Sequence, residues 1–478
     1  MVAVKTDAFK VASQRALHDA RIQAALARFG PFDEARQRAI QELGPERWQE
    51  LRERAHQIKR HTVQHLDYYL DLFAQRAAQN GTVVHFARDV AEANSVVVEL
   101  VRRHGVRLVT KGKSMVSEEM GINHLLEDLG VEVVETDLGE FIIQLAREAP
   151  FHIIAPAVHK SREQVADLFQ EHGVTSRRLG RIEDLCAAAR ERLRDKFLHA
   201  DMGMTGVNFA VAETGTFMVV TNEGNGRMCT STPRIHVATM GLEKLVPSLE
   251  DLAVFLRLLP RAATGQRISS YMTFVNGPRR PSDEDGPDEV HVIILDNGRT
   301  RLLEDEALHQ ALYCVRCGAC LNVCPVYRKV GGHAYGWVYP GPIGSIWTPV
   351  QVGLPRARDL PHASSLCGAC HEACPVKINI PHMLLHLRRR LAEGGPQDRK
   401  APLGERLMAR AFVAVMRSHR RLALGRALAA FFQRLLAEDG RISSVPFPPF
   451  NRWTRERDMP ALAPRSFHQV WDEELAER

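Results

Sequence analysis

The spacing of apolar residues changes several times along the chain, and each change predicts a different kind of element. Up to about residue 80 the chain is rich in charge, and apolar side chains such as Leu66, Leu70 and Phe73 recur at the spacing of one helix face. Asn80-Gly81 then interrupts the pattern, as residues at helix ends do. The sequence therefore predicts a helical N-terminal region.

Beyond residue 81 short apolar runs alternate with amphipathic stretches. The runs predict strands at 82–87, 106–110, 131–134 and 151–155, and the amphipathic stretches predict helices at 90–105, 122–130 and 138–147. A further helix is expected after Ser161, because Ser161 and Gln164 have the spacing of a capping box. Strands that alternate with helices of this length predict a mostly parallel sheet covered on both faces.

Strand patterns dominate the next stretch, from about residue 206 to residue 300. The expected strands are 208–212, 215–221, 234–240, 270–275 and 290–295, with one helix near 248–258. This stretch continues the α/β pattern that precedes it.

Helical periodicity returns near the end of the chain. Pro381 opens a predicted helix that runs to about Glu393, and residues 402–437 contain two further helical patterns. The second of these gathers an apolar face, made of Leu424, Leu428, Phe431, Phe432 and Leu435. A face of this width predicts packing against the same chain or a partner, and peripheral contact with a membrane surface is the alternative.

These changes of pattern divide the chain into four parts. They are a helical N-terminal extension at 1–76, an α/β domain at 77–300, a cysteine-rich domain at 301–390 and a helical C-terminal region at 391–478.

Seven of the nine cysteines fall in two short motifs. The first is Cys314-x2-Cys317-x2-Cys320-x3-Cys324-Pro325, the spacing of bacterial ferredoxins, and the second is Cys367-x2-Cys370-x3-Cys374-Pro375. In ferredoxins with two clusters, the Cys that precedes Pro ligates the cluster of the other motif. This rule predicts one 4Fe-4S cluster on Cys314, Cys317, Cys320 and Cys374, and a second cluster on Cys324, Cys367 and Cys370.

The second set of cysteines is one ligand short, because a complete motif would have a Cys where this chain has Ser364. The fourth ligand could be Ser364, His362, Cys229, Cys186, a water molecule or a partner residue, and a three-iron cluster is also compatible with the pattern. Zinc is disfavoured, because zinc sites usually combine two Cys-x2-Cys pairs separated by a dozen or more residues.

The composition is that of an ordinary globular protein, with 45% hydrophobic and 25% charged residues among 478. The net charge of +6 is slight for this length and gives no case for nucleic-acid binding. The first residues lack the apolar core of a signal peptide, and no apolar run is long enough to span a bilayer. We therefore expect a cytoplasmic protein.

Two stretches of the α/β domain carry candidate chemistry. Gly112-Lys113-Ser114 cannot be a phosphate-binding loop of the usual kind, because that loop needs Gly where this chain has Arg107. It could instead hold a substrate carboxylate near Lys113 and Ser114, unless Ser114 only caps a helix. Glu213 could act as a base or an acyl acceptor, although a role in hairpin geometry is the favoured interpretation.

Several motifs of the α/β domain occur in a distinctive order before the cysteines. They are Thr110-Lys111-Gly112-Lys113-Ser114-Met115, Glu135-Thr136-Asp137-Leu138-Gly139-Glu140, Ala212-Glu213-Thr214-Gly215-Thr216 and Asn276-Gly277-Pro278, and the cysteine-rich domain adds Tyr335-Gly336-Trp337-Val338-Tyr339-Pro340-Gly341-Pro342-Ile343-Gly344. In this order the chain resembles the lactate utilisation protein B family, the iron–sulfur proteins of a three-part L-lactate oxidation system. The resemblance covers nearly the whole chain from about residue 60.

The resemblance implies a fold class. The α/β domain would be of the LUD type, related to CoA-transferase and sugar-isomerase-like α/β domains. An α-helical, ferredoxin-like domain with two 4Fe-4S clusters would follow it, with helical extensions at both ends of the chain. An incomplete second cysteine motif is itself implied by the family.

The resemblance also implies a function and partners. The chain would be the electron-transfer subunit of a complex that oxidises L-lactate to pyruvate. Its partners would be a protein similar to the iron–sulfur subunit of glycolate oxidase (lactate utilisation protein A) and a protein made of the LUD domain alone (lactate utilisation protein C). A stand-alone acyl- or CoA-transfer enzyme with structural clusters, or a redox-sensing interaction protein, are the alternatives.

Overall fold

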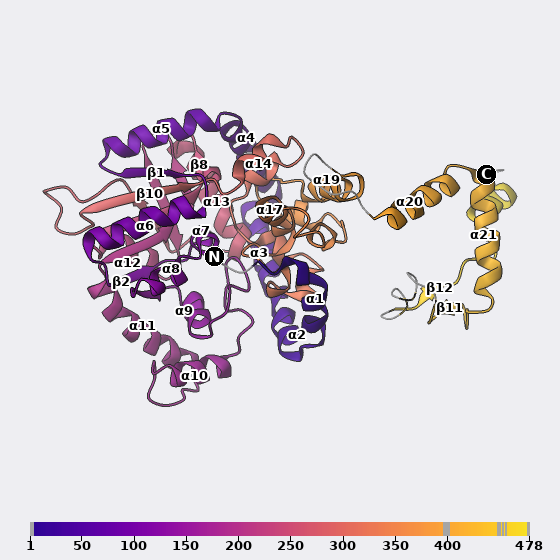
Figure 1. Cartoon of the computed structure of the whole chain (residues 1–478), viewed down its shortest axis with the longest axis horizontal. Helices are drawn as coiled ribbons and strands as arrows, with labels where there is room; N and C mark the ends of the chain where they lie inside the picture. Colours follow the sequence, from indigo (N-terminus) through magenta and orange to yellow (C-terminus); the bar gives the residue numbers. More distant parts are fainter. Residues whose placement is uncertain (1–3, 395–401, 447–450, 452–453, 455–456, 476–478) are drawn as a thin grey trace. The chain divides into compact units, whose positions relative to one another are not determined.

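The computed structural model describes residues 4–394, 402–446, 451, 454 and 457–475 (Figure 1). The described residues form two compact units, which meet in sequence after Leu391. The first unit contains a six-stranded sheet, a four-stranded sheet and the cysteine motifs, and the second contains the C-terminal helices and a two-stranded sheet.

A six-stranded parallel sheet forms the centre of the first unit (Figure 1). In spatial order its strands are β1 (Val83–Ala87), β10 (Glu289–Leu295), β7 (Ile235–Gly241), β4 (Met202–Gly206), β2 (Leu108–Lys111) and β3 (Glu132–Glu135). Every pairing in this sheet is parallel, as the alternation of strands and helices predicted.

Alternate residues of the central strands face opposite sides of the sheet. On one side Val237, Ile293 and Leu295 pack with the apolar residues of α6 (Val90–His104), α7 (Met115–Met120) and α8 (Ile122–Asp128). On the other side Met240 and Ile294 pack with α5 (Leu66–Gln79) and with the second sheet. Both faces are therefore covered, which explains why these strands are almost continuously apolar.

The second sheet has four strands, in the order β8 (Leu245–Val246), β5 (Phe209–Val211), β6 (Thr216–Thr221) and β9 (Tyr271–Val275). The remaining helices of the α/β part are α9 (Leu138–Leu145), α10 (Arg162–Glu171), α11 (Ile182–His199), α12 (Asn225–Ser231), α13 (Leu249–Thr264) and α14 (Arg299–Glu304). The capping box at Ser161 is present at the start of α10, as its spacing predicted.

The strand expected at 151–155 is absent, so that prediction was wrong. Phe151 is fully buried, but its N–H donates to Pro156 O at 3.0 Å within a turn, and its carbonyl accepts a hydrogen bond from Tyr327 Oη at 2.6 Å. The apolar run thus fills a contact with the cysteine-rich part instead of joining the sheet. The central strand β4, whose sequence Met-Gly-Met-Thr-Gly has a single β-branched residue, was missed.

The N-terminal helices belong to the same compact unit as the cysteines. They are α1 (Phe9–His18), α2 (Ala20–Leu26), α3 (Gly30–Leu43) and α4 (Pro45–Gln64). Their buried residues, among them Phe29 and Trp48, share one hydrophobic core with those of the cysteine-rich part. The predicted N-terminal extension is therefore helical, and it packs on the domain that follows the sheet in sequence.

The cysteine-rich part consists of short helices and loops. Its α-helices are α15 (Ala319–Asn322), α16 (Tyr327–Val330), α17 (Gly341–Val352), α18 (Ala369–Ala373) and α19 (Ile380–Glu393). Trp347 on α17 is fully buried, as are Tyr313, Tyr327, Tyr335 and Tyr339. These large side chains supply much of the core that surrounds the cysteines.

The second unit contains α20 (Leu403–Met416), α21 (His419–Gln433), β11 (Arg441–Ile442), β12 (Met459–Pro460) and α22 (Phe467–Val470). The predicted apolar face of α21 is exposed, with Leu424 and Phe431 at 63% and 64% of their full accessibility, and Leu435 just beyond the helix is exposed as well. Among the described helices of the whole chain, none combines the length and the apolar character needed to cross a membrane.

Candidate metal centre and the adjoining cleft

The two cysteine motifs adopt the same local turn. In each, a Cys-Gly-Ala-Cys sequence places its Gly at positive φ, 74° for Gly318 and 86° for Gly368, and a short helix follows. The residue before each Cys-Gly-Ala-Cys sequence, Arg316 or Leu366, also has positive φ, 59° and 58°, which residues other than glycine rarely adopt. A matching unusual backbone at both places indicates two versions of one ligand-binding loop.

Four cysteines line one small cavity. Cys314, Cys317, Cys320 and Cys374 surround it together with apolar neighbours that include Ile153, Ile343 and Ile378. The first three come from one motif and Cys374 comes from the end of the other. These are the four cysteines that the sequence predicts to hold one cluster, and they are here called the first thiol group.

Burial dominates the chemistry of the first thiol group. It raises the pKa of Cys374 to about 11 and also raises the pKa values of Cys317 and Cys320, and nearby cysteines add to the shifts of Cys317 and Cys320. Without a cation the thiols of Cys317, Cys320 and Cys374 stay protonated, because several thiolates in an apolar cavity would repel one another. Iron would reverse that balance, since it binds thiolates. A dry cavity lined by four sulfurs therefore fits the predicted cluster.

The other three motif cysteines, Cys324, Cys367 and Cys370, interact with one another and are here called the second thiol group. Burial, followed by the charge of Cys324, raises the pKa of Cys370 to about 12. Cys367 differs, because it is exposed and its pKa is lowered, first by a hydrogen bond from the Ala369 N–H and then by Ser365. The second group is thus open to solvent on the side of Cys367.

The fourth ligand of the second group stays open among the predicted candidates. Ser364 lies in the loop before Cys367, and its hydroxyl accepts a hydrogen bond from the Leu366 N–H at 3.1 Å. His362, in the same loop, is exposed. Cys229 and Cys186 lie on α12 and α11 of the α/β part, where Cys229 contacts Thr136 Oγ1 at 3.5 Å. The assignment of the seven cysteines as iron ligands likewise stays a prediction.

A cleft of about 220 Å³ lies where the central strands β2, β4 and β7 end. It is lined by residues that follow or close these strands, such as Lys113, Asn208 and Lys244, and by the ends of β6 and α13. Ligands of open parallel sheets characteristically bind at the carboxyl ends of the strands. The position therefore marks the cleft as a candidate binding site.

The cleft and the cysteine cavity share part of their walls. Ile153 and Arg316 line both. Arg316 stands between Cys314 and Cys317 in sequence, and its guanidinium lies 4.3 Å from the ring centre of Tyr339 and 4.0 Å from that of Trp347. One buried cation thus borders both the cleft and the first thiol group.

A buried network of charges joins the α/β part to the cysteine-rich part. Arg299 Nη2 lies 2.8 Å from Glu119 Oε1 and Arg299 Nε lies 2.7 Å from Glu243 Oε2, and all three side chains are fully buried. Arg316 Nη2 reaches Glu243 Oε1 at 3.1 Å, and Tyr339 Oη donates to Glu119. Arg299 and Arg316 hold the pKa of Glu243 at about 2 despite its burial. The network fixes the first thiol group relative to the cleft.

Helix α4 reaches the same region from the N-terminus. Arg52 Nε donates to Cys374 O at 2.9 Å and Arg52 Nη2 donates to His371 O at 3.1 Å. Lys59 donates to the carbonyls of Glu243 and Leu245, and burial lowers its pKa to about 7. The N-terminal extension therefore braces the motif that ends at Cys374 and the segment that carries Lys244.

The other sequence-predicted candidates have structural contacts. Ser114 caps α7 by accepting a hydrogen bond from the Ser117 N–H at 3.1 Å, and its hydroxyl also lies 3.0 Å from Thr239 Oγ1. Glu213 is exposed, lies outside the set of cleft-lining residues and accepts a hydrogen bond from the Leu249 N–H at the start of α13. The favoured structural interpretation of Glu213 agrees with this geometry.

Four of the motifs behind the family resemblance meet in pairs inside the α/β part. Lys111 Nζ lies 2.8 Å from Glu135 Oε1 in a fully buried pair, across the neighbouring strands β2 and β3. Asn276 Oδ1 accepts hydrogen bonds from Asn80 Nδ2 and from Thr216 Oγ1. These contacts join neighbouring elements of the domain.

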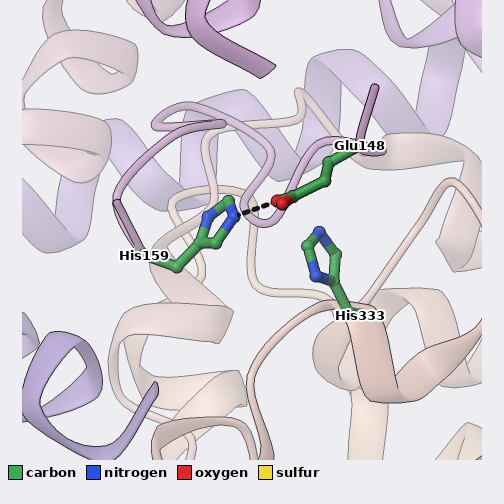
Figure 2. A group of neighbouring side chains, drawn as sticks. All are labelled: Glu148, His159 and His333. Carbon is green, nitrogen blue, oxygen red and sulfur yellow. Dashed lines mark hydrogen bonds and ion pairs between the residues drawn. The ribbon is translucent and has the colours of Figure 1, made fainter. Parts of the chain in front are cut away.

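A third group of side chains with metal-binding chemistry joins the loop after α9 to the cysteine-rich part. Figure 2 shows Glu148, His159 and His333 gathered together, with His159 Nε2 at 2.6 Å from Glu148 Oε2. Lys160 also contacts Glu148, and the hydrogen bond from His159, together with Lys160, lowers the pKa of Glu148 to about 2. The carboxylate is thus ionised and its charge is balanced by Lys160, so the group forms an ion-pair link.

Sequence reasoning missed Lys244 and Arg316. Neither belongs to a recognisable motif, and Arg316 is hidden inside Cys314-x2-Cys317 as a variable position. The only available signal was that a cation within a cysteine motif must lie close to the ligand set. Their meeting at one cleft depends on the packing of two domains.

Comparisons with known proteins cover most of the chain. Family models match as "LUD domain" at 70–295, "4Fe-4S dicluster domain" at 310–378 and "Lactate utilisation protein B, C-terminal" at 387–476. Three curated relatives share the name "Lactate utilization protein B". That of Bacillus licheniformis is 43% identical over 92% of this chain and 91% of its own length, that of Bacillus velezensis 44% over 89% and 88%, and that of Bacillus subtilis 41% over 99% and 98%.

Proposed function

The chain belongs to the lactate utilisation protein B family, and we propose that it is the iron–sulfur electron-transfer subunit of a complex that oxidises L-lactate to pyruvate. The 4Fe-4S dicluster domain supports an iron–sulfur role in lactate utilisation. One observation carries the proposal: four cysteines from two motifs surround a single apolar cavity.

In this proposal the seven motif cysteines hold two clusters. Cys314, Cys317, Cys320 and Cys374 hold the first, and Cys324, Cys367 and Cys370 hold the second with a fourth ligand still to be identified. When bound, 4Fe-4S clusters accept and release electrons one at a time.

The protein's own residues set the conditions for that chemistry. Ile153, Ile343 and Ile378 keep water from the first thiol group. The Ile378 N–H approaches Cys374 Sγ at 3.4 Å and the Tyr327 N–H approaches Cys324 Sγ at 3.4 Å. Hydrogen bonds to the sulfurs and a nearby cation both stabilise added negative charge, so these contacts and Arg316 would raise the reduction potentials.

The family supplies the proposed partners. They are a protein similar to the iron–sulfur subunit of glycolate oxidase and a protein made of the LUD domain alone, acting together in the cytoplasm. The name shared by the relatives supports membership of such a lactate utilisation system.

The proposal is tested with anaerobically purified protein. Its visible absorption is recorded while L-lactate is added, with and without the two partner proteins. We expect bleaching by lactate only when the partners are present, at a rate that matches turnover of the complex. Clusters that stay oxidised in the complete mixture while lactate is consumed would exclude an electron-transfer role.

A further inference from the structure

We propose that the cleft at the ends of β2, β4 and β7 binds a small 2-hydroxycarboxylate anion, with its carboxylate between Lys244 and Arg316. The site is a property of this chain alone. Only the choice of L-lactate as the ligand rests on the proposed function.

The cleft walls carry an excess of positive charge. The cations are Lys113, Lys244 and Arg316, and the acidic lining residues are Asp137 and Glu223. Asp137 is committed to capping α9, where it accepts a hydrogen bond from the Glu140 N–H at 3.1 Å. Glu223 accepts one from the Asn222 N–H at 3.2 Å. The three cations outnumber the two carboxylates, so the cleft favours an anion.

Two of these buried cations keep unused hydrogen-bonding capacity. Arg316 is 8% exposed, and its Nη1 atom has no hydrogen-bond partner while Nη2 holds Glu243. Lys244 is 7% exposed, and its ammonium makes no hydrogen bond or ion pair with the part of the chain that the structure describes. The nearest counter-charge of both cations is Glu243, which already pairs with Arg299 and Arg316. A carboxylate between Lys244 and Arg316 would therefore supply a second counter-charge and the missing hydrogen-bond acceptors.

The rest of the cleft suits a small hydroxy acid. Its volume of about 220 Å³ is below the roughly 300–1,000 Å³ of pockets that hold drug-sized ligands. Asn225 Oδ1 is buried there without a partner and can accept a hydrogen bond from a hydroxyl group. Ile153, Val220 and Leu259 supply an apolar wall for a methyl group.

The position of Arg316 connects this site to the first thiol group. The same guanidinium that would meet the carboxylate also lines the cysteine cavity. An anion in the cleft would partly neutralise that cation, so its binding is expected to change the spectrum of the reduced first cluster as well as to release heat.

The test is equilibrium binding of L-lactate to anaerobically purified full-length protein, measured by calorimetry. We expect saturable binding to one site per chain, and at least tenfold weaker binding in Lys244→Met. Lys113→Gln is expected to weaken binding several-fold. Lys196→Gln is the matched control, since Lys196 is also partly buried but lies on α11 beside Glu132, and it should bind lactate normally.

The variants are expected to stay folded, because Lys244 loses no hydrogen bond, and the thermal transition checks this. Absence of lactate binding to the wild type, equal binding by Lys244→Met and the wild type, or equal affinity for acetate or phosphate would overturn the proposal.

Iron is counted in the same samples. Lactate binding by a protein without iron would retain the site and reject the proposed function, whereas reduction by lactate and partners without lactate binding would do the reverse.

Discussion

The two thiol groups share a local backbone but differ in their surroundings. The turns at Gly318 and Gly368 have the same conformation, yet Cys317 is buried and its counterpart Cys367 is exposed. Ile153, Ile343 and α4 enclose the first group, whereas the second group has no counterpart of Cys314 and ends at the surface. The motif therefore specifies the loop, and the packing around it specifies the environment of the sulfur.

This difference assigns separate tasks to the two groups within the proposed function. The first thiol group adjoins the cleft through Arg316, and the second is open at Cys367. We expect electrons to be exchanged with a partner protein on the exposed side. Substitutions at equivalent positions of the two thiol groups test this difference most directly.

The largest effect is expected from Cys317→Ser, which removes a buried ligand. About four iron atoms per chain should be lost, since one 4Fe-4S cluster fails to assemble. The thermal transition should also fall sharply, because the remaining thiols of the cavity lose their bound metal. Metal analysis and calorimetric unfolding measure the two effects.

Cys367→Ser, at the equivalent position, provides the comparison. It should also lose about four iron atoms per chain, but with a much smaller change in the thermal transition, because Cys367 is exposed. Equal destabilisation by the two substitutions would contradict the distinction between the groups.

The next largest effect is expected in the buried network of charges beside the first thiol group. Arg299→Met leaves the buried carboxylates of Glu119 and Glu243 without their main partner, so the free energy of unfolding should fall by about 3–5 kcal/mol. Urea unfolding measures the loss. Arg88→Gln is the control, because Arg88 is an exposed partner of Glu92, and it should leave the transition unchanged. Similar urea unfolding transitions for the two variants would refute a stabilising role of the buried charge network.

A smaller effect is expected where α4 braces the end of the second motif. Arg52→Met removes the donors to Cys374 O and His371 O, and we expect a loss of about 1.5–3 kcal/mol in the free energy of unfolding. Arg54→Gln, on the same helix but paired at the surface with Asp251, should cost much less. An Arg52→Met protein as stable as Arg54→Gln would argue against the bracing role.

The smallest effect is expected from supplying a thiol to the second group. Ser364→Cys adds a cysteine at the position that a complete motif would occupy, three residues before Cys367. We expect an unchanged fold and a few-fold slower loss of iron to a chelator. Ser364→Ala is the control, because it changes the same position without adding a thiol, and it should give no such protection. Equal protection by both would mean that the added thiol is irrelevant.

The cysteine grouping shows how far the sequence could be interpreted. The spacing of Cys314 to Cys324 predicted that three sulfurs lie near one another, because a short motif confines its residues to one loop. The rule that the Cys before Pro joins the other motif added Cys374 to them. The parallel sheet was also predictable, since β7 and β10 are apolar on both faces. Both features are encoded within short stretches of the chain.

The errors arose where tertiary contacts decided the outcome. The run 151–155 has strand composition, but Tyr327 and Gly332 of the cysteine-rich part hold it as a turn. Lys244 and Arg316 lie more than seventy positions apart and meet only because two domains pack together. No local pattern could reveal a cleft formed in that way.

Metal analysis of the wild-type protein tests the central claim most directly. The protein is purified without oxygen, and iron, zinc and sulfide are measured per chain together with the visible spectrum. The account predicts a brown protein with about eight iron atoms per chain and a matching amount of sulfide. A colourless protein, or one that carries zinc in place of iron, would contradict it.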